Sequence, residues 1–496
     1  MILGNTYEEP ATPYQKSLAE AFQTVLGIDR VGITDNFFEL GGDSLLAIKL
    51  QIEAFNKGLD LSYKDIFKYP TIKQLSENVS STNSKDDDFK DDYDYTEINE
   101  LLKNNVFNSK EKLSKNKFKN VLLTGSTGYL GSHILDALLK NTKCNVYCLI
   151  RAKDNNDPQI RLLNTLRFYF GNKYDRQIFN RIIVIEGDIK EDQLGLNDLY
   201  YEELGNTIDV VINSAAIVKH YGNLDTFNAT NIQGAKNIIR FCSAYKCKLY
   251  HLSTLSVSGN IFETDSYKVA DLSSDIIFNE QSLYIGQDLS NVYIYTKFIA
   301  ERLILENILN GTIDAKIIRL GNITNRYSDG IFQINVSENA FLNRINSFLH
   351  IGCIPDYLAD RYMEFSPVDF CAEAIVKLVC YNNNFTIYHV YNNNHITFRE
   401  LLSILATLKV DMKIVDKETF NRRINTLSKD DKSRNILSGI INDFDGNKDL
   451  IYKSIIKLQY NSTNKILKNL SFKWPKVNEK YMKKYVIYLK SIGYIK

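Results

Sequence analysis

The chain of 496 residues has little of what marks disulfide-rich or metal-binding proteins. It contains seven cysteines, an odd number, and none of them form a Cys-x-x-Cys pair, which argues against a disulfide framework. Its six histidines are scattered, without a His-Glu-x-x-His string or a Cys/His cluster, so the sequence indicates no metal site. We therefore expect a reduced protein that binds no metal ion.

Long apolar runs and an excess of charge of one sign are also missing. No apolar run is long enough to span a bilayer, and no basic region followed by an apolar stretch marks a secretory signal. The formal net charge is +1, so nothing points to nucleic acid or an anionic membrane as a partner. The content of 44% hydrophobic and 24% charged residues is typical of soluble globular proteins. We expect a cytoplasmic protein of two or three domains.

What is present begins with a small all-α unit, which we place at residues 10–80. Apolar residues recur at helical spacing, Gly27 is a candidate helix stop, and Pro70 ends a short helix. Asp43 or Ser44 can cap the second helix, and Thr71 can cap the last. The four expected helices are Tyr14–Leu26, Leu45–Phe55, Tyr63–Lys68 and a final helix from Thr71 to Val79.

The composition changes after this unit, and we place a linker at residues 81–112. The segment Lys85–Asp94 consists almost entirely of Asp and Lys, so it cannot bury apolar surface and indicates a solvated connection. The segment Ile98–Val106 has the pattern of a helix that docks onto the next domain.

The remaining chain, residues 113–496, alternates strands and helices. The strands are short and rich in Val and Ile, as buried parallel strands are. Helical stretches such as Tyr129–Leu139 and Asn231–Cys242 separate them, which predicts a Rossmann-type, doubly wound α/β sheet over about 115–325. We assign 326–496 mainly to a smaller C-terminal substrate lobe. The expected strands are Asn120–Thr124, Asn145–Ile150, Ile182–Glu186, Val210–Asn213, Lys248–Ser253 and Ala315–Leu320.

The most specific string of the first unit surrounds Ser44 and runs from Asp35 to Leu45 (Asp-Asn-Phe-Phe-Glu-Leu-Gly-Gly-Asp-Ser-Leu). Two glycines allow a tight turn before a helix, and the free N–H groups of a helix N-terminus favour a phosphate ester there. The string resembles the attachment site of peptidyl carrier proteins. That resemblance implies a covalent 4′-phosphopantetheine on Ser44, whose thiol holds the substrate as a thioester. The alternative is that Ser44 is a simple helix cap.

A strand, a glycine-rich turn and a helix follow one another at residues 121–131, as in a dinucleotide-binding site. Gly125 permits the turn, Gly128 lets the pyrophosphate approach the backbone, and Gly131 lets the helix pack closely on the strand. The residues expected to bind the cofactor here are Gly125, Ser126, Thr127, Gly128, Tyr129, Leu130 and Gly131.

The preference between the two nicotinamide cofactors is expected about 20 residues further on. Arg151 stands where an Asp or Glu would bind the ribose 2′-hydroxyl of NAD, and its guanidinium suits a 2′-phosphate. We therefore expect NADPH. Arg161 is a candidate second phosphate contact or a solvated surface residue. Asp188 and Ile189 are candidate adenine contacts, and Asp188 is alternatively a turn or cap residue.

Tyr293 and Lys297 are spaced by four residues and therefore lie on one face of a predicted helix. A nearby ammonium favours phenolate, which makes Tyr293 a usable proton donor, and Lys297 can also bind the nicotinamide ribose. A hydroxyl at the end of the strand before them, in the string His251–Gly259, can hold a carbonyl oxygen. The glycine turn and these residues resemble the extended short-chain dehydrogenase/reductase family. Its Ser/Thr-x-x-Val-x-Gly pattern selects Thr254, with Ser253 as the rival.

Further strings narrow the resemblance. Residues 148–152 (Cys-Leu-Ile-Arg-Ala), 319–323 (Arg-Leu-Gly-Asn-Ile), Phe332-Gln333 and 364–369 (Glu-Phe-Ser-Pro-Val-Asp) are similar to terminal thioester reductase domains of peptide synthetases and to reductase domains of carboxylic acid reductases. The resemblance implies NADPH-dependent release of a carrier-bound acyl or peptidyl thioester as an aldehyde, or onward to an alcohol. It implies as partners upstream adenylation and condensation modules, in the same synthetase or in trans, and a phosphopantetheinyl transferase.

Two other functions are compatible with part of this pattern. A free-substrate extended short-chain dehydrogenase or sugar-nucleotide epimerase would explain residues 119–330 but not the string around Ser44. A redox-inactive scaffold that holds the carrier would not need Tyr293 and Lys297, which are both present.

Overall fold

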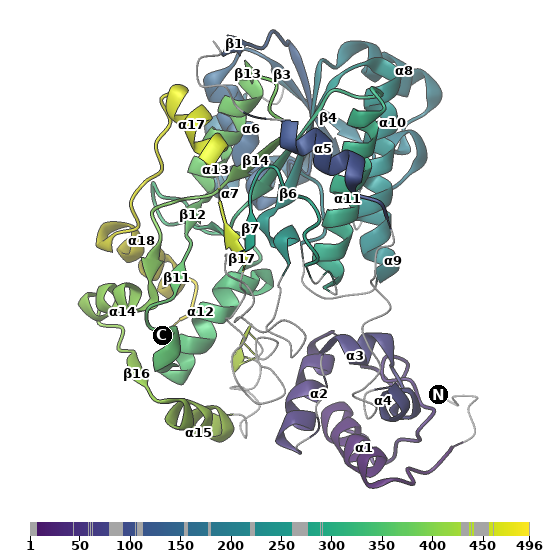
Figure 1. Cartoon of the computed structure of the whole chain (residues 1–496), viewed down its shortest axis with the longest axis vertical. Helices are drawn as coiled ribbons and strands as arrows, with labels where there is room; N and C mark the ends of the chain where they lie inside the picture. Colours follow the sequence, from purple (N-terminus) through teal and green to yellow (C-terminus); the bar gives the residue numbers. More distant parts are fainter. Residues whose placement is uncertain are drawn as a thin grey trace.

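The computed structural model of the chain contains a small helical unit and a larger α/β unit (Figure 1). Each unit has its own hydrophobic core. The structure describes residues 7–78, 93–106, 113–152, 157–176, 180–218, 224–259, 276–427, 436–440 and 456–495, apart from residues 43, 58, 60, 62, 105, 288, 290, 438 and 460. Asp43 and the acidic and basic run 85–92 of the expected linker lie outside the described residues.

The four helices expected in the first unit are all present. Thr12 begins α1 with a capping box, and Gly27 ends it in the left-handed conformation (φ 67°) that an L side chain rarely adopts. Thr71 caps α4, where its hydroxyl accepts the Gln74 N–H at 3.2 Å. Leu18, Phe22, Phe37 and other apolar residues form the core. The helices are α1 (Pro13–Leu26), α2 (Ser44–Asn56), α3 (Tyr63–Lys68) and α4 (Ile72–Asn78).

A seven-stranded parallel sheet forms the centre of the α/β unit. Its order is β14-β8-β6-β5-β2-β3-β4, so the chain winds outward in both directions from the neighbours β2 and β5. All six strands expected from the sequence are present. The seven strands are β2 (Asn120–Thr124), β3 (Asn145–Ile150), β4 (Ile182–Glu186), β5 (Val210–Asn213), β6 (Lys248–Thr254), β8 (Ala315–Leu320) and β14 (Ile387–Val390).

Helices cover both faces of this sheet, as its two-sided apolar strands require (Figure 1). One face packs against α6, α7, α13 and α17, and the other against α8, α10 and α11. The short helix α5, expected in the segment after the linker, docks on α11 through Ile98 and Leu102. These helices are α5 (Thr96–Asn104), α6 (Tyr129–Asn141), α7 (Pro158–Phe170), α8 (Asp198–Thr207), α10 (Gly234–Tyr245), α11 (Val292–Leu309), α13 (Val368–Cys380) and α17 (Asn461–Asn469).

Two features of the sheet differ from the expectation. The chain returns to the sheet after the expected boundary near residue 325, because β14 pairs with β8 and α13 packs on α6. The expected α-helix at 231–242 begins instead as a π-helical turn, Asn228–Gln233, before α10. The buried Asn231 explains the turn, since its side chain bonds both backbone groups of Ile217.

The other late elements form a third core beside the sheet, at the lower left of Figure 1. The helices there are α12 (Ala340–Ile351), α14 (Phe398–Thr407), α15 (Lys417–Leu427) and α18 (Glu479–Ser491). The short strand pairs are β10 (Cys353–Pro355) with β16 (Lys413–Val415) and β11 (Tyr362–Met363) with β15 (Ile396–Thr397). Within the described ranges, no helix is long and apolar enough to cross a membrane, and no three His, Cys, Asp or Glu side chains gather as metal ligands.

Candidate active site

The glycine turn between β2 and α6 is crowded enough to require glycine. Gly125 has a φ of +70°, and a Cβ there would lie 2.8 Å from the backbone nitrogen of Ala215. A Cβ on Gly131 would lie 2.0 Å from the carbonyl oxygen of Gly125. The turn therefore packs closely against both the loop after β5 and the first turn of α6, as a dinucleotide-binding turn does.

The N-terminus of α6 lies at this turn. Gly128 is its N-cap and supplies no side-chain cap, which suits the approach of an anion to the N–H groups of the helix. The Tyr129 hydroxyl donates to the carbonyl oxygens of Thr324 at 3.0 Å and Ile331 at 3.2 Å. The Tyr129 side chain thus ties α6 to the later part of the chain. Ser126 is buried, and Thr127 and Leu130 are half-buried.

The two arginines expected near the adenosine end lie together. Arg151 is exposed just after β3, and the Arg161 guanidinium donates to its carbonyl oxygen. Asp157 caps α7 between them by accepting the N–H groups of Gln159 and Ile160. The Arg161 guanidinium therefore lies beside the backbone of Arg151, just beyond the carboxyl end of β3.

Asp188 and Ile189 follow β4 at the same edge of the sheet. The Asp188 carboxylate accepts the Lys190 N–H at 3.1 Å and lies 3.5 Å from the Lys190 ammonium. Ile189 is buried against Gly234, where a Cβ would meet its side chain at 2.7 Å. Asp188 thus has the contacts of a turn residue, the alternative that the sequence left open.

Tyr293 lies in the first turn of α11, whose N-cap is Asn291. Burial raises the pKa of Tyr293 to about 12, and a hydrogen bond with Thr254 acts in the opposite direction. The Thr254 hydroxyl also accepts the Ser256 N–H at 3.1 Å. The rival Ser253 is buried, and its hydroxyl has no hydrogen-bond partner among the described residues. The fold therefore joins Tyr293 to Thr254 and not to Ser253.

Lys297 lies one turn further along α11 and is 3% exposed. Its Nζ donates to the carbonyl oxygen of Leu252 at 2.6 Å and lies 3.1 Å from Nε2 of His251. Burial lowers the pKa of Lys297 to about 8, although the Glu301 carboxylate favours the charged form. Tyr293, Lys297 and Thr254 thus form one buried group at the carboxyl end of β6.

Two sets of polar residues around this group were not predicted from the sequence. Asn213 and His251 lie beside Thr124 in the sheet register, and their side chains bond in a row that ends at Lys297. Glu301 on α11 forms a fully buried ion pair with Arg319 on β8, with a shortest contact of 2.6 Å. His251 and Arg319 belong to strings that also suggested the family, but only the strand register shows what they contact.

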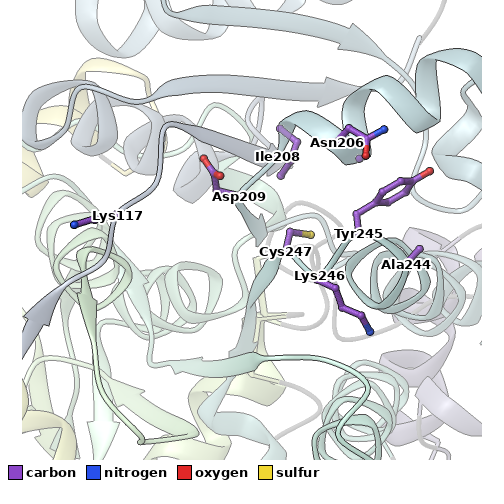
Figure 2. Close-up of a pocket in the computed structure, with 9 residues that line it drawn as sticks. Lys117, Asn206, Ile208, Asp209, Ala244, Tyr245, Lys246 and Cys247 are labelled. Atoms are coloured by element: carbon purple, nitrogen blue, oxygen red, sulfur yellow. The ribbon is translucent and has the colours of Figure 1, made fainter.

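A hollow of about 540 Å³ lies elsewhere, at the amino edge of the sheet (Figure 2). It is lined by Lys117, Asp209, Tyr245, Lys246 and Cys247, among others. These residues lie where β2, β5 and β6 begin, whereas the glycine turn and Tyr293 lie where the strands end. In open α/β sheets ligands bind at the carboxyl ends of the strands, so this hollow is not the candidate active site.

Ser44 is the first residue of α2. Its side chain lies outside the described residues. The turn before it is tight, since Gly41 has a φ of +97° and a Cβ on Gly42 would lie 2.5 Å from the carbonyl oxygen of Phe37. The backbone thus places residue 44 at a helix N-terminus directly after a glycine turn.

Comparisons with known proteins agree with this two-part structure. The family described as male sterility protein, an NAD-binding family, matches residues 123–375, and the phosphopantetheine attachment site matches residues 16–79. A subunit of the linear gramicidin synthase of Brevibacillus parabrevis is 26% identical over 99% of this chain, which spans 10% of that subunit.

Solved structures give the same result. The thiolation-reductase di-domain of an archaeal non-ribosomal peptide synthetase is 34% identical, with a TM-score of 0.87 over 99% of this chain and 100% of that one. The aureusimine cluster reductase domain is 28% identical, with a TM-score of 0.64 over 80% of this chain and 96% of that one. This chain therefore belongs to the male sterility protein family of NAD-binding reductases, with a phosphopantetheine attachment domain in front, as in the thiolation-reductase di-domains of non-ribosomal peptide synthetases.

Proposed function

We propose that the chain holds an acyl or peptidyl thioester on a phosphopantetheine arm at Ser44 and reduces it with NADPH, releasing an aldehyde. A second reduction of the same kind gives an alcohol. The observation that carries the proposal is the buried group of Tyr293, Thr254 and Lys297 in a chain that also contains the attachment domain. A reductase and its substrate carrier are thereby joined.

The residues present fit a dinucleotide. Any Cβ at Gly125 or Gly131 would collide with backbone, and the uncapped N-terminus of α6 is suited to a pyrophosphate. Arg151 and Arg161 favour the 2′-phosphate that distinguishes NADPH from NADH, because a guanidinium binds phosphate in a bidentate manner. When bound, the reduced nicotinamide supplies the hydride that the thioester carbon receives.

The side chains of the buried group stabilise the charge and supply the proton. As the carbonyl oxygen of the thioester becomes negative, the hydroxyls of Thr254 and Tyr293 donate to it. Tyr293 then transfers its phenolic proton to that oxygen, which gives a thiohemiacetal, and the Lys297 ammonium stabilises the phenolate that remains. The carbon–sulfur bond of the thiohemiacetal breaks and its hydroxyl proton passes to the leaving sulfur, so one hydride and one proton convert the thioester into an aldehyde and a free thiol.

The phosphopantetheine arm lowers the affinity that the substrate pocket needs. Because the arm keeps the acyl group at a high effective concentration, the pocket need not bind the free acyl group tightly. A carrier also requires partners: a phosphopantetheinyl transferase to modify Ser44, and upstream adenylation and condensation modules, in the same synthetase or in trans, to load it.

The test uses the full chain, loaded at Ser44 by a phosphopantetheinyl transferase with acyl-coenzyme A. In Tyr293→Phe, consumption of NADPH should fall by about 10²–10⁴-fold, because the proton donor is lost. The mass increase on Ser44 should persist. Tyr295→Phe, which removes the hydroxyl of the next tyrosine on α11, is the matched control and should retain activity. Full activity in Tyr293→Phe would contradict the proposal.

The carrier and the cofactor preference have separate tests. Ser44→Ala should abolish reduction of the tethered substrate but not of a free acyl thioester. Arg151→Gln should raise the KM for NADPH roughly ten- to a hundredfold, the value of a charge-assisted hydrogen bond, and leave that for NADH unchanged. Arg167→Gln, on the same α7 but paired with Asp175, is the control. An equal effect on both cofactors would refute the assignment of Arg151.

A further inference from the structure

Three neighbouring strands place three polar side chains in a single row that leads to Lys297. Thr124, Asn213 and His251 are direct register partners across β2, β5 and β6, and each is at most 2% exposed. The row begins at the residue before Gly125 and ends 3.1 Å from Nζ of Lys297. A continuous hydrogen-bonded path thus connects the glycine turn to α11.

The hydrogen-bond directions in this row are fixed from its first member. The Thr124 hydroxyl accepts the N–H groups of Ser214 and Ala215, both at 3.1 Å, so both of its lone pairs are used. Its own proton must therefore go to Oδ1 of Asn213, at 2.6 Å. The amide nitrogen of Asn213 is thereby left to face His251.

The orientation of Asn213 decides the tautomer of His251. Nδ2 of Asn213 lies 3.1 Å from Nδ1 of His251 and can only donate, so Nδ1 must be the acceptor. Burial and the charge of Lys297 keep the pKa of His251 well below its usual value, so the ring is neutral. The ring proton is therefore on Nε2 and points at Nζ of Lys297.

This arrangement stabilises the neutral amine of Lys297 relative to its ammonium form. A neutral amine has a lone pair that accepts the Nε2–H, while its own N–H donates to the Leu252 carbonyl. An ammonium has only donors, so its formation sets N–H against N–H at 3.1 Å. Among the described residues, the other charged or titratable groups near Lys297 are Tyr293 and Glu301 on its own helix and Arg319, which is paired with Glu301.

We propose that His251, held in one tautomer by Asn213 and Thr124, is a positioning residue that sets the proton affinity of Lys297. The row makes the lysine give up its proton more readily than burial alone would, and so determines the pH above which the ammonium beside Tyr293 is lost. This inference rests on the proposed reduction, in which that ammonium stabilises the tyrosine phenolate.

The first measurement does not depend on catalysis. Nitrogen NMR of the full chain labelled with ¹⁵N-histidine distinguishes the two neutral tautomers, and the His251 signals are those lost in His251→Gln. The expected result is a neutral ring protonated on Nε2. A ring protonated on Nδ1 would overturn the proposal.

The second measurement changes the row and follows the pH dependence of the rate with loaded substrate. In Asn213→Asp, one carboxylate oxygen still accepts from Thr124 and the other accepts from Nδ1–H, so the tautomer switches and Nε2 offers a lone pair to the ammonium. The alkaline fall in rate should move up by about one pH unit or more. Thr124→Val adds no charge but frees the Asn213 amide to turn, and should shift the fall in the same direction by less.

The matched control is Asn325→Asp. Asn325 is also buried, but its Oδ1 accepts the Tyr481 hydroxyl at 2.6 Å, away from the row, and a carboxylate oxygen keeps that contact. Its pH profile should match that of the unaltered chain. A switched tautomer in Asn213→Asp without a shift in the pH profile would overturn the proposal. Failure of the unaltered chain to reduce any loaded thioester would instead contradict the proposed function, while the tautomer measurement would still stand.

Discussion

Two successive turns of α11 carry buried charged side chains that behave differently. Glu301 meets Arg319, whose Nε and terminal nitrogen donate to its two carboxylate oxygens, and both side chains are fully buried. In the part of the chain that the structure describes, Lys297 instead contacts a neutral imidazole and a carbonyl oxygen. Charges that neutralise each other hold the helix on β8. A buried cation without such a partner has a lowered pKa and is available for chemistry.

The largest effect on stability is expected from breaking the ion pair between Glu301 and Arg319. Arg319→Met should lower the free energy of unfolding by about 3–5 kcal/mol, because it leaves the Glu301 carboxylate buried without a counter-charge. Chemical denaturation measures this change. The double variant Arg319→Met, Glu301→Leu should recover most of the loss, since an apolar pair of similar volume carries no desolvation cost. A single variant as stable as the unaltered chain would mean that the pair does not anchor α11.

Lys297→Met should, in contrast to Arg319→Met, affect the rate of reduction more than the stability. Reduction should fall by about 10²-fold or more because the phenolate loses its counter-charge. Stability should change mainly in its pH dependence. Between the folded pKa of about 8 and the unfolded value of 10.5, the unfolded chain holds a proton that the folded chain does not, so the stability of the unaltered chain rises with pH over that window. Lys297→Met should lack this rise. An identical pH dependence in both chains would show that the lysine pKa is not lowered.

The smallest effect is expected at the start of the helix. The Asn291 side chain accepts the N–H groups of Tyr293 at 3.0 Å and Ile294 at 3.2 Å. Asn291→Ala should therefore cost about 1 kcal/mol of stability, the usual value of an N-cap. Thermal unfolding measures it, and Asn291→Ser, which can still cap, is the control. A loss as large as that of Arg319→Met would mean that the anchor of α11 is its cap.

Features that depend on local pattern were predicted best from the sequence. The helix signals at Gly27 and Thr71 indicated the four-helix unit, and the short apolar runs indicated six of the seven sheet strands. Turns, caps and burial each favour particular residue types at regular spacing, so they can be recognised in the sequence. The spacing of Tyr293 and Lys297 placed them on one helical face for the same reason. The family of the reductase was indicated by strings of neighbouring residues.

Features that depend on contacts between distant segments were not predicted. β14, Ile387–Val390, is composed of strand-favouring residues like the predicted β5, but it lies beyond residue 325, in the part that the sequence pattern assigned mainly to the substrate lobe. The partnership of Thr124, Asn213 and His251 exists only once the strand register is known. The π-helical turn at 228–233 likewise accompanies the bonds of Asn231 to Ile217, which lies in the loop after β5.

The late return of the chain to the sheet affects how this protein folds during synthesis. When β8 leaves the ribosome, its outer edge has no neighbour, and the face of α6 that α13 will cover is still exposed. The strand edge and the helix face are covered only once about 70 further residues have emerged, because β14 pairs with β8 across that length of chain. Closing so long a loop costs conformational entropy. A chain cut near residue 325 therefore presents an uncovered, apolar strand edge, the kind of surface on which aggregation starts.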